Sequence, residues 1–307
     1  MIIRNFLFHR VSDEADPMWP PMKPSLFSKI ISYLTRHYAI VPLEHWLDDP
    51  GSFQTKRKTA TVLFDDGYKD NMEIAVPILD KYKCPASFYI VTDCIDKNIP
   101  TWTYIIDNIF LKTKKQMIEL SYDFVPEKFR SFQLQVNDQP NPVIKEVKPW
   151  LKKLPNKQRL LIIQAILSQC DDEPVPGNKM MNWDDIRRLD SKGYIIGSHS
   201  HTHPMLASLQ NESEISEELG ISAQRIQQEI GKFPRTISYP IGSFDERVIH
   251  LSEKAGYQYG LAVKQQFFNP GKDGLFKIPR VELYQEPWWK VQMRIHGVYS
   301  RVKKIWP

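Results

Sequence analysis

The chain has 307 residues, and its 42% hydrophobic and 12% aromatic content is typical of a folded globular protein rather than a disordered one. Its net charge of +5 is far below that of a nucleic-acid-binding surface, so no nucleic-acid partner is expected. Three scattered cysteines, Cys84, Cys94 and Cys170, exclude a disulfide framework and a thiolate metal site.

The apolar run at residues 2–8 is too short for a signal peptide, and no small-residue cleavage site follows it. We predict instead that these residues form a first β-strand. No window approaches the ~18 uninterrupted apolar residues that a membrane span needs. We therefore expect a cytoplasmic protein, with peripheral association at the inner membrane face as an alternative. A chain from which a leader had been removed would look the same.

Apolar strand-like runs then alternate with helical patterns through most of the chain. The predicted strands are 2–8, 60–64, 86–91, 194–197, 235–239, 259–263 and 278–283. The predicted helices are 25–37, 71–82, 182–192, 212–229 and 245–255. This alternation predicts a single α/β domain over residues 1–307, with a parallel sheet wrapped by helices.

Residues 99–179 interrupt this alternation. They contain helical patterns at 102–112, 143–154 and 156–169 but no convincing strand. We interpret them as a helical insertion that serves as a lid or a substrate-shaping wall; a surface excursion without a role is the alternative.

The stretch 61–67 (TVLFDDG) ends an apolar strand in two adjacent carboxylates, Asp65 and Asp66. Gly67 allows the chain to turn out of the sheet there, so the two acids can serve different partners. A turn or helix-capping pair without chemistry is the alternative. Further along, His199 and His203 are four residues apart, which predicts that they share one face of a helical turn. One Asp and two His form the kind of set that catalytic metal sites use.

These residues resemble the polysaccharide deacetylases of carbohydrate esterase family 4, the NodB-homology group. The first motif of that family is matched by 64–67 (FDDG), the second by 199–204 (HSHTHP), and the third, with departures, by 239–245 (YPIGSFD). The resemblance covers about 58–285 outside the insertion. It implies a distorted (β/α) barrel of the NodB-homology type and metal-assisted hydrolysis of a linear amide C–N bond.

The resemblance also implies roles for individual residues. Asp66, His199 and His203 would bind a divalent metal, with Zn²⁺ as the default and Co²⁺, Ni²⁺ or Fe²⁺ as alternatives. Asp65 would be the general base, and the backbone N–H after Pro240, at Ile241, would stabilise the oxyanion.

Two departures from the family pattern leave roles open. The arginine that commonly orients the base is replaced by Ser238, and Arg280 is our candidate substitute, although it can also be an ordinary barrel-end arginine. No terminal strand supplies the usual acid histidine, so His296 is a candidate acid. His9 resembles the opening histidine of exopolysaccharide deacetylases and is a candidate substrate contact, or a barrel-end histidine bonded to backbone.

Several aromatic residues are candidate substrate contacts, although most aromatics in such a chain belong to the core. They are Tyr239, Trp183, which is also typical of an N-capped helix start, and Trp102, which could stack on a sugar ring. The C-terminal stretch 286–307 mixes aromatic and basic residues and predicts a helix that lies at a membrane interface or packs on the barrel.

The sequence thus predicts a metal-dependent hydrolase that removes N-acetyl groups from N-acetylhexosamine units of a bacterial glycan or its precursor. The expected substrate is an acetylated glycan or a lipid-linked saccharide. Hydrolysis of a small non-sugar amide by the same site and non-catalytic glycan binding remain alternatives. The linkage, the physiological metal and the oligomeric state are not predicted.

Overall fold

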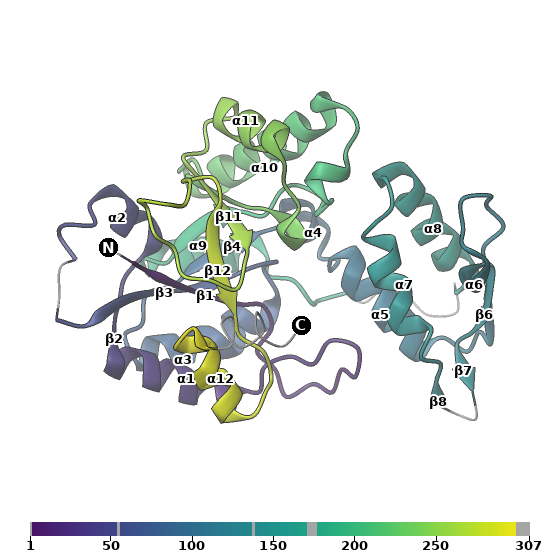
Figure 1. Ribbon diagram of the computed structural model, residues 1–307, viewed down its shortest axis with the longest axis horizontal. Coiled ribbons are helices and arrows are strands. Elements are labelled where there is room, and N and C mark those ends of the chain that lie inside the picture. Colours follow the sequence, from purple (N-terminus) through teal and green to yellow (C-terminus); the bar gives the residue numbers. More distant parts are fainter. Residues whose placement is uncertain (1, 54–55, 137–138, 171–176, 299–307) are drawn as a thin grey trace.

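The computed structural model describes residues 2–53, 56–136, 139–170 and 177–298 (Figure 1). Seven parallel strands close into a barrel in the order β1-β12-β11-β10-β9-β4-β3, because β1 also pairs with β3. They are β1 (Arg4–Phe8), β3 (Lys58–Phe64), β4 (Ser87–Ile90), β9 (Ile195–Ser198), β10 (Thr236–Ser238), β11 (Tyr259–Val263) and β12 (Ile278–Glu282). The predicted distorted (β/α) barrel is confirmed. An eighth strand, β2 (Tyr38–Ile40), pairs with β3 and was not predicted.

Helices surround the barrel, as the alternating pattern predicts. They are α1 (Pro24–His37), α2 (Leu43–Asp48), η1 (Asn71–Ala75), α3 (Val76–Lys81), α4 (Thr92–Lys97), α9 (Trp183–Ser191), η2 (Leu206–Ser208), α10 (Glu212–Ile230), η3 (Pro240–Gly242), α11 (Glu246–Lys254) and α12 (Trp288–Ile295). Figure 1 shows α10 and α11 on one side of the barrel and α1, α3 and α12 on the other. Helix α9 begins with a capping box in which Asn182 and Asp185 satisfy each other's backbone N–H groups.

The barrel interior is filled by side chains from alternate strand positions. Leu63, Tyr89, Leu261 and Ile278 are buried there in one apolar cluster. Gly197 faces the same interior, where a Cβ would lie 2.3 Å from the Tyr89 ring, so only glycine fits. Because the interior is packed, polar chemistry is confined to the rim at the carboxyl ends of the strands.

The insertion packs around an apolar cluster of its own, which includes Ile109, Phe129 and Ile162. Its elements are α5 (Trp102–Lys112), β5 (Met117–Glu119), α6 (Glu127–Arg130), β6 (Ser131–Gln133), β7 (Gln135–Val136), β8 (Gln139–Pro140), α7 (Ile144–Leu151) and α8 (Asn156–Gln169). The three expected helices are present. The insertion also contains two short antiparallel strand pairs, β5–β6 and β7–β8, which the sequence did not indicate. In Figure 1 this segment lies beside the barrel as a separate lobe.

The predicted C-terminal helix appears as α12, and residues 299–307 of that stretch lie outside the described part of the chain. Trp288 is partly buried against the main core, whereas Trp289 is 58% exposed. Of the helices described, none combines the length and apolar character needed to cross a bilayer.

Candidate active site

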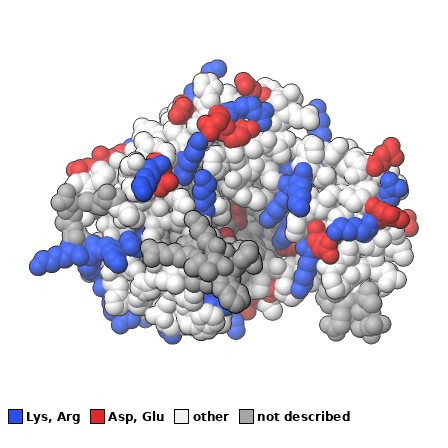
Figure 2. Space-filling model, in the orientation of Figure 1, with Lys and Arg blue, Asp and Glu red and all other residues white. Residues whose placement is uncertain are grey.

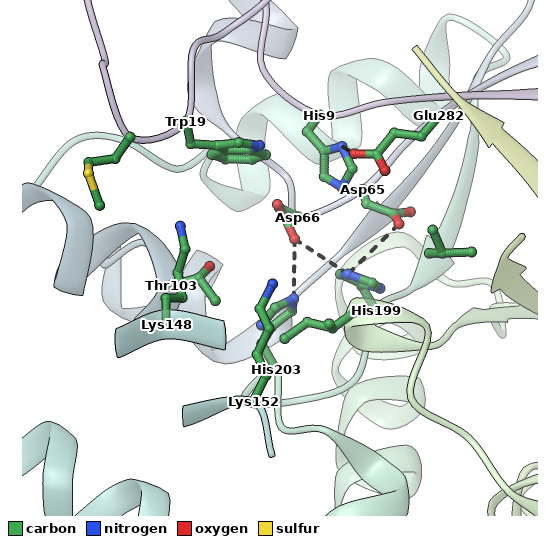
Figure 3. A pocket seen from close by; sticks show the side chains of 13 residues that line it. His9, Trp19, Asp65, Asp66, Thr103, Lys148, Lys152, His199, His203 and Glu282 are labelled. Carbon is green, nitrogen blue, oxygen red and sulfur yellow. Dashed lines mark ion pairs between the residues drawn. The ribbon is translucent and has the colours of Figure 1, made fainter. Parts of the chain in front are cut away.

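The two adjacent acids leave the end of β3 in different directions. Asp66 has a φ of 75° and Gly67 a φ of 87°, so the chain turns sharply out of the barrel at this pair. Asp65 is 2% exposed and Asp66 is 5% exposed. Figure 3 shows Asp66 directed toward both His199 and His203, while Asp65 lies beside His199 alone.

His199 and His203 follow the end of β9 in a loop rather than in the helical turn that their spacing predicts. Ser200 and His203 adopt left-handed backbone conformations, with φ of 66° and 61°, and these bring the two imidazoles together by a different route. The ring centroids are 5.0 Å apart. Each Nε2 atom lies 3.4 Å from Oδ1 of Asp66.

This donor set fits a divalent cation. One donor atom from each of Asp66, His199 and His203 lies within 4.8 Å of the others, and all three residues are buried. The Nδ1 of His199 is 2.7 Å from the carbonyl oxygen of Ser238, which can only accept, so Nδ1 carries the proton. With Nδ1 as the donor, the neutral form of the ring would direct its Nε2 lone pair toward the Asp66 carboxylate, an arrangement that a cation between them would stabilise.

Burial and neighbouring charges shift the pKa of each of the three residues. Burial alone would raise the pKa of Asp66, but His199 and His203 together hold it well below the usual value. Burial lowers the pKa of His203 to about 3, so its ring is neutral at physiological pH. Burial also opposes charge on His199, but Asp65 and Asp66 raise its pKa.

Asp65 is held by two residues from other strands. Its Oδ1 accepts a 2.8 Å hydrogen bond from Nη1 of Arg280 on β12, and the Ser238 hydroxyl on β10 lies 3.0 Å and 3.1 Å from its two oxygens. Burial opposes ionisation of this carboxyl, but Arg280 and His199 keep its pKa below the usual value. The structure therefore brings the candidate substitute arginine to the candidate base. The second oxygen, Oδ2, lies 3.9 Å from Nε2 of His199, on the side of the metal ligands.

A histidine–carboxylate pair lies on another side of the same site. His9, just after β1, has Nδ1 3.4 Å from Oε1 of Glu282 at the end of β12 (Figure 3). The indole of Trp19 meets the His9 ring edge-on at a centroid distance of 5.4 Å. His9 therefore lies beside a side-chain carboxylate that can orient its ring.

These groups line a pocket of about 390 Å³. The barrel contributes the acids and histidines above together with Ile241, and the insertion contributes Thr103, Lys148 and Lys152. Ile241 has a φ of 58° within η3, a conformation that a β-branched residue rarely adopts. Strain of this kind concentrates at functional sites, and Asp66 and His203 share it here.

A family model for polysaccharide deacetylases matches residues 53–260. The chain belongs to the polysaccharide deacetylase family. Among curated proteins, the chain is 32% identical over 76 residues to an uncharacterized 30.6 kDa protein of Geobacillus stearothermophilus, covering 24% of this chain and 28% of that protein. It is 35% identical over 66 residues to the uncharacterized protein YlxY of Bacillus subtilis, covering 22% of this chain and 20% of that one. The matches thus span less than a third of either curated relative.

Solved deacetylase structures share the fold over nearly the whole chain. The deacetylase PplD of Streptococcus pyogenes, solved with acetate, has a TM-score of 0.63 at 12% identity and covers 96% of this chain and 97% of that one. A de-N-acetylase from Aggregatibacter actinomycetemcomitans has a TM-score of 0.62 at 17% identity and covers 95% of this chain and 98% of that one. IcaB of Ammonifex degensii has a TM-score of 0.62 at 14% identity, with coverages of 96% and 97%.

The candidate site does not include every residue that the sequence predicted for it. His296 is exposed at the end of α12, where its Nε2 bonds the Tyr33 hydroxyl at 3.0 Å, so its assignment as the acid is corrected. Trp183 donates its indole N–H to Asp96 and lies outside the pocket lining. Trp102 also lies outside the lining. Its indole N–H donates to the backbone oxygen of His203 at 3.3 Å.

The third motif is divided between the wall and the core. Tyr239 is fully buried and stacks on Phe244 with ring centroids 4.9 Å apart, so it is a core residue rather than a substrate contact. Pro240 is buried at the start of η3, and Ile241 after it lines the pocket. The first two motifs contribute the side chains of the site, and the third contributes the backbone at Ile241.

Sequence reasoning missed several pocket residues of the deacetylase. Glu282 was detectable, because it lies two residues after Arg280 on one strand and so faces the same side. Lys148 and Lys152 are i,i+4 neighbours on a predicted helix, but no motif distinguishes them from surface lysines. Trp19 gave no signal, since it lies in an irregular segment after β1.

Proposed function

We propose that this deacetylase is a metal-dependent hydrolase that removes N-acetyl groups from N-acetylhexosamine units of a bacterial glycan or glycan precursor. The observation that carries the proposal is the convergence of Asp66, His199 and His203 beside a buried, ion-paired Asp65 at the floor of an open pocket. The family is metal-dependent in general, and this donor set is consistent with that property.

Asp66, His199 and His203 would hold the divalent cation, with zinc as the default. When bound, such a cation polarises the acetamide carbonyl and lowers the pKa of a coordinated water. The hydrogen bond from Nδ1 of His199 to the Ser238 carbonyl fixes the ring so that Nε2 is the ligand atom.

Asp65 is the candidate general base. Arg280 and Ser238 hold its Oδ1, and Arg280 favours the charged form, so the carboxylate is ionised and fixed in orientation. Its Oδ2 faces the metal ligands and would take the proton from the attacking water.

His9 replaces His296 as the candidate general acid. Glu282 fixes its Nδ1, which leaves Nε2 to give a proton to the leaving amine nitrogen. The N–H of Ile241, on the pocket wall, is the candidate donor to the oxyanion of the tetrahedral intermediate. One proton is taken from water and one is delivered to nitrogen, giving acetate and the free amine.

The test is acetate release by protein stripped with chelator and reloaded with zinc, cobalt or nickel. The panel contains a chitooligosaccharide, a β-1,6-linked N-acetylglucosamine oligomer, a lipid-linked saccharide and a set of small non-sugar amides. Release from at least one saccharide, dependent on metal and lost in Asp65→Asn, supports the proposal. Release from the small amides alone would replace the substrate, and none from any member with metal bound would reject deacetylation.

A further inference from the structure

Two lysines of the insertion form one wall of the catalytic pocket. Lys148 lies on α7 and Lys152 caps its C-terminal end, four residues later, so both side chains leave the same helix face. Figure 3 shows them on the side of Thr103 and His203, across the pocket from His9. In Figure 2, Lys and Arg side chains flank the hollow between the barrel and the insertion lobe.

The two ammonium groups differ in their partners. Lys148 forms an ion pair with Asp107 of α5, whose carboxylate is buried. Within the described parts of the chain, the Lys152 ammonium has neither a carboxylate at ion-pair distance nor a side-chain hydrogen bond, although its side chain is partly buried. Burial and Lys148 lower the pKa of Lys152 despite the opposing charges of Asp107, Glu282 and Asp66. A cation in such a place lacks the partner that would offset its desolvation.

The remaining charges of the pocket leave this cation unmatched. Asp65 is neutralised by Arg280, and Lys148 by Asp107. With a divalent cation on Asp66, that cation and Lys152 carry three positive charges against the two negative charges of Asp66 and Glu282, and a protonated His9 would add a fourth. A concave site with an excess of one sign attracts a ligand of the opposite sign.

From these contacts we propose that Lys152 selects substrates that carry an oxyanion group, either a phosphate or a carboxylate, next to the N-acetylated sugar. The inference rests on the proposed function, since it concerns the same pocket. The anionic group would lie on the insertion side, by Lys152 and the already paired Lys148, and the acetamide over Asp66 and the two histidines. This placement also keeps the anion away from Glu282, which lies with His9 on the other side (Figure 3).

The test measures binding to the metal-loaded His9→Gln protein, in which turnover is slowed and the pairing of Asp65 with Arg280 is kept. The probes are N-acetylglucosamine 1-phosphate, a disaccharide of glucuronic acid and N-acetylglucosamine, and neutral chitobiose, compared by calorimetry. At least one charged probe is expected to bind about tenfold more tightly than chitobiose, a difference of the size that one close ionic contact provides. Which charged probe is preferred tells phosphate from carboxylate.

Three second-site variants make the comparison specific. Lys152→Gln is expected to abolish the preference, and Lys152→Arg to retain it. Lys153→Gln is the matched control, because Lys153 is exposed and outside the pocket lining. Thermal unfolding of each variant shows whether the fold survives.

Two results would overturn the inference. One is chitobiose binding as tightly as both charged probes. The other is a charge preference that survives in a folded Lys152→Gln protein, which would place the anion on the metal itself. If the preference holds but the wild-type protein releases no acetate from any saccharide, the proposed function fails while the charge selection stands.

Discussion

The barrel rim and the insertion contribute to the same pocket in different ways. On the rim the candidate base and the candidate acid have protein partners: Arg280 and Ser238 for Asp65, and Glu282 for His9. On the insertion wall the Lys152 ammonium has none among the described residues. Groups whose positions are fixed before the substrate binds are suited to catalysis, whereas a cation without a protein partner is suited to binding an anionic substrate. The comparison suggests that the rim sets the reaction and the insertion sets the substrate.

The largest expected effect is on the rim, at the base. Asp65→Asn keeps the shape of the side chain but removes the proton acceptor, so kcat should fall about a thousandfold, within the range for general bases. Metal content, measured by plasma mass spectrometry, should stay at the wild-type value because Asp65 is not among the three predicted ligands. Loss of metal together with activity would mean that Asp65 is a ligand instead.

His9→Gln tests the acid, and the expected loss of kcat on an N-acetyl sugar is about a hundredfold. An activated aryl acetate needs no proton on its leaving group, so its hydrolysis should be nearly unchanged in the same variant. His296→Gln is the matched control and should behave as wild type, since His296 bonds Tyr33 outside the pocket. Equal losses on both substrates would remove His9 from the acid role.

Arg280→Met tests the electrostatic support of the base. Without Arg280 the pKa of Asp65 should rise, and the acid limb of the rate profile should move to higher pH. Because the pKa of Asp65 is lower in the folded than in the unfolded chain, its ionised carboxylate stabilises the fold at pH values above the pKa of the unfolded chain. This stabilisation is lost as the pH falls through the pKa of the folded chain. Removing one partner of a buried pair should cost about 3 kcal/mol of unfolding free energy at neutral pH, with the difference shrinking below about pH 4.

Urea unfolding at several pH values checks this stability prediction, alongside the rate profile. A conservative Ser238→Ala change, which removes only a hydroxyl donor, should shift both measurements in the same direction but less. An Arg280→Met protein with an unchanged acid limb would show that the ion pair does not control the protonation of Asp65.

The smallest effect is expected where the insertion touches the rim. Trp102→Phe removes the indole N–H that donates to the His203 carbonyl, a loss of about 1 kcal/mol, so metal affinity should fall about fivefold. Trp183→Phe removes a comparable indole hydrogen bond, to Asp96, away from the site and is the control. If competition with a chelator gives the same metal affinity for both variants, the hydrogen bond from the insertion does not stabilise the loop that carries His203.

The sequence predicted the parallel strands well because each strand is a short apolar run, and buried parallel strands have this pattern. Their closure into a barrel was implied by the family resemblance. The sequence also identified the candidate site residues Asp65, Asp66, His199 and His203, because they lie in contiguous motifs at strand ends. The helical turn assumed for the two histidines was wrong because positive φ at Ser200 and His203 leaves no mark in residue spacing.

Pairings across the barrel were harder to predict. Asp65 and Arg280 are 215 residues apart, and closure of the barrel decides which rim side chains meet. His9 and Glu282 were separated in the same way, so His296 was preferred on its place in the chain alone. Lys152 could not be identified before the orientation of the insertion against the rim was known.

The central claim is that Asp66, His199 and His203 bind one cation while Asp65 stays free. Anomalous diffraction from zinc-loaded crystals at the zinc edge tests it most directly. The account predicts one peak per chain, within bonding distance of a carboxylate oxygen of Asp66 and the Nε2 atoms of His199 and His203. A peak bound to Asp65, or no peak near these residues at full zinc loading, would contradict it.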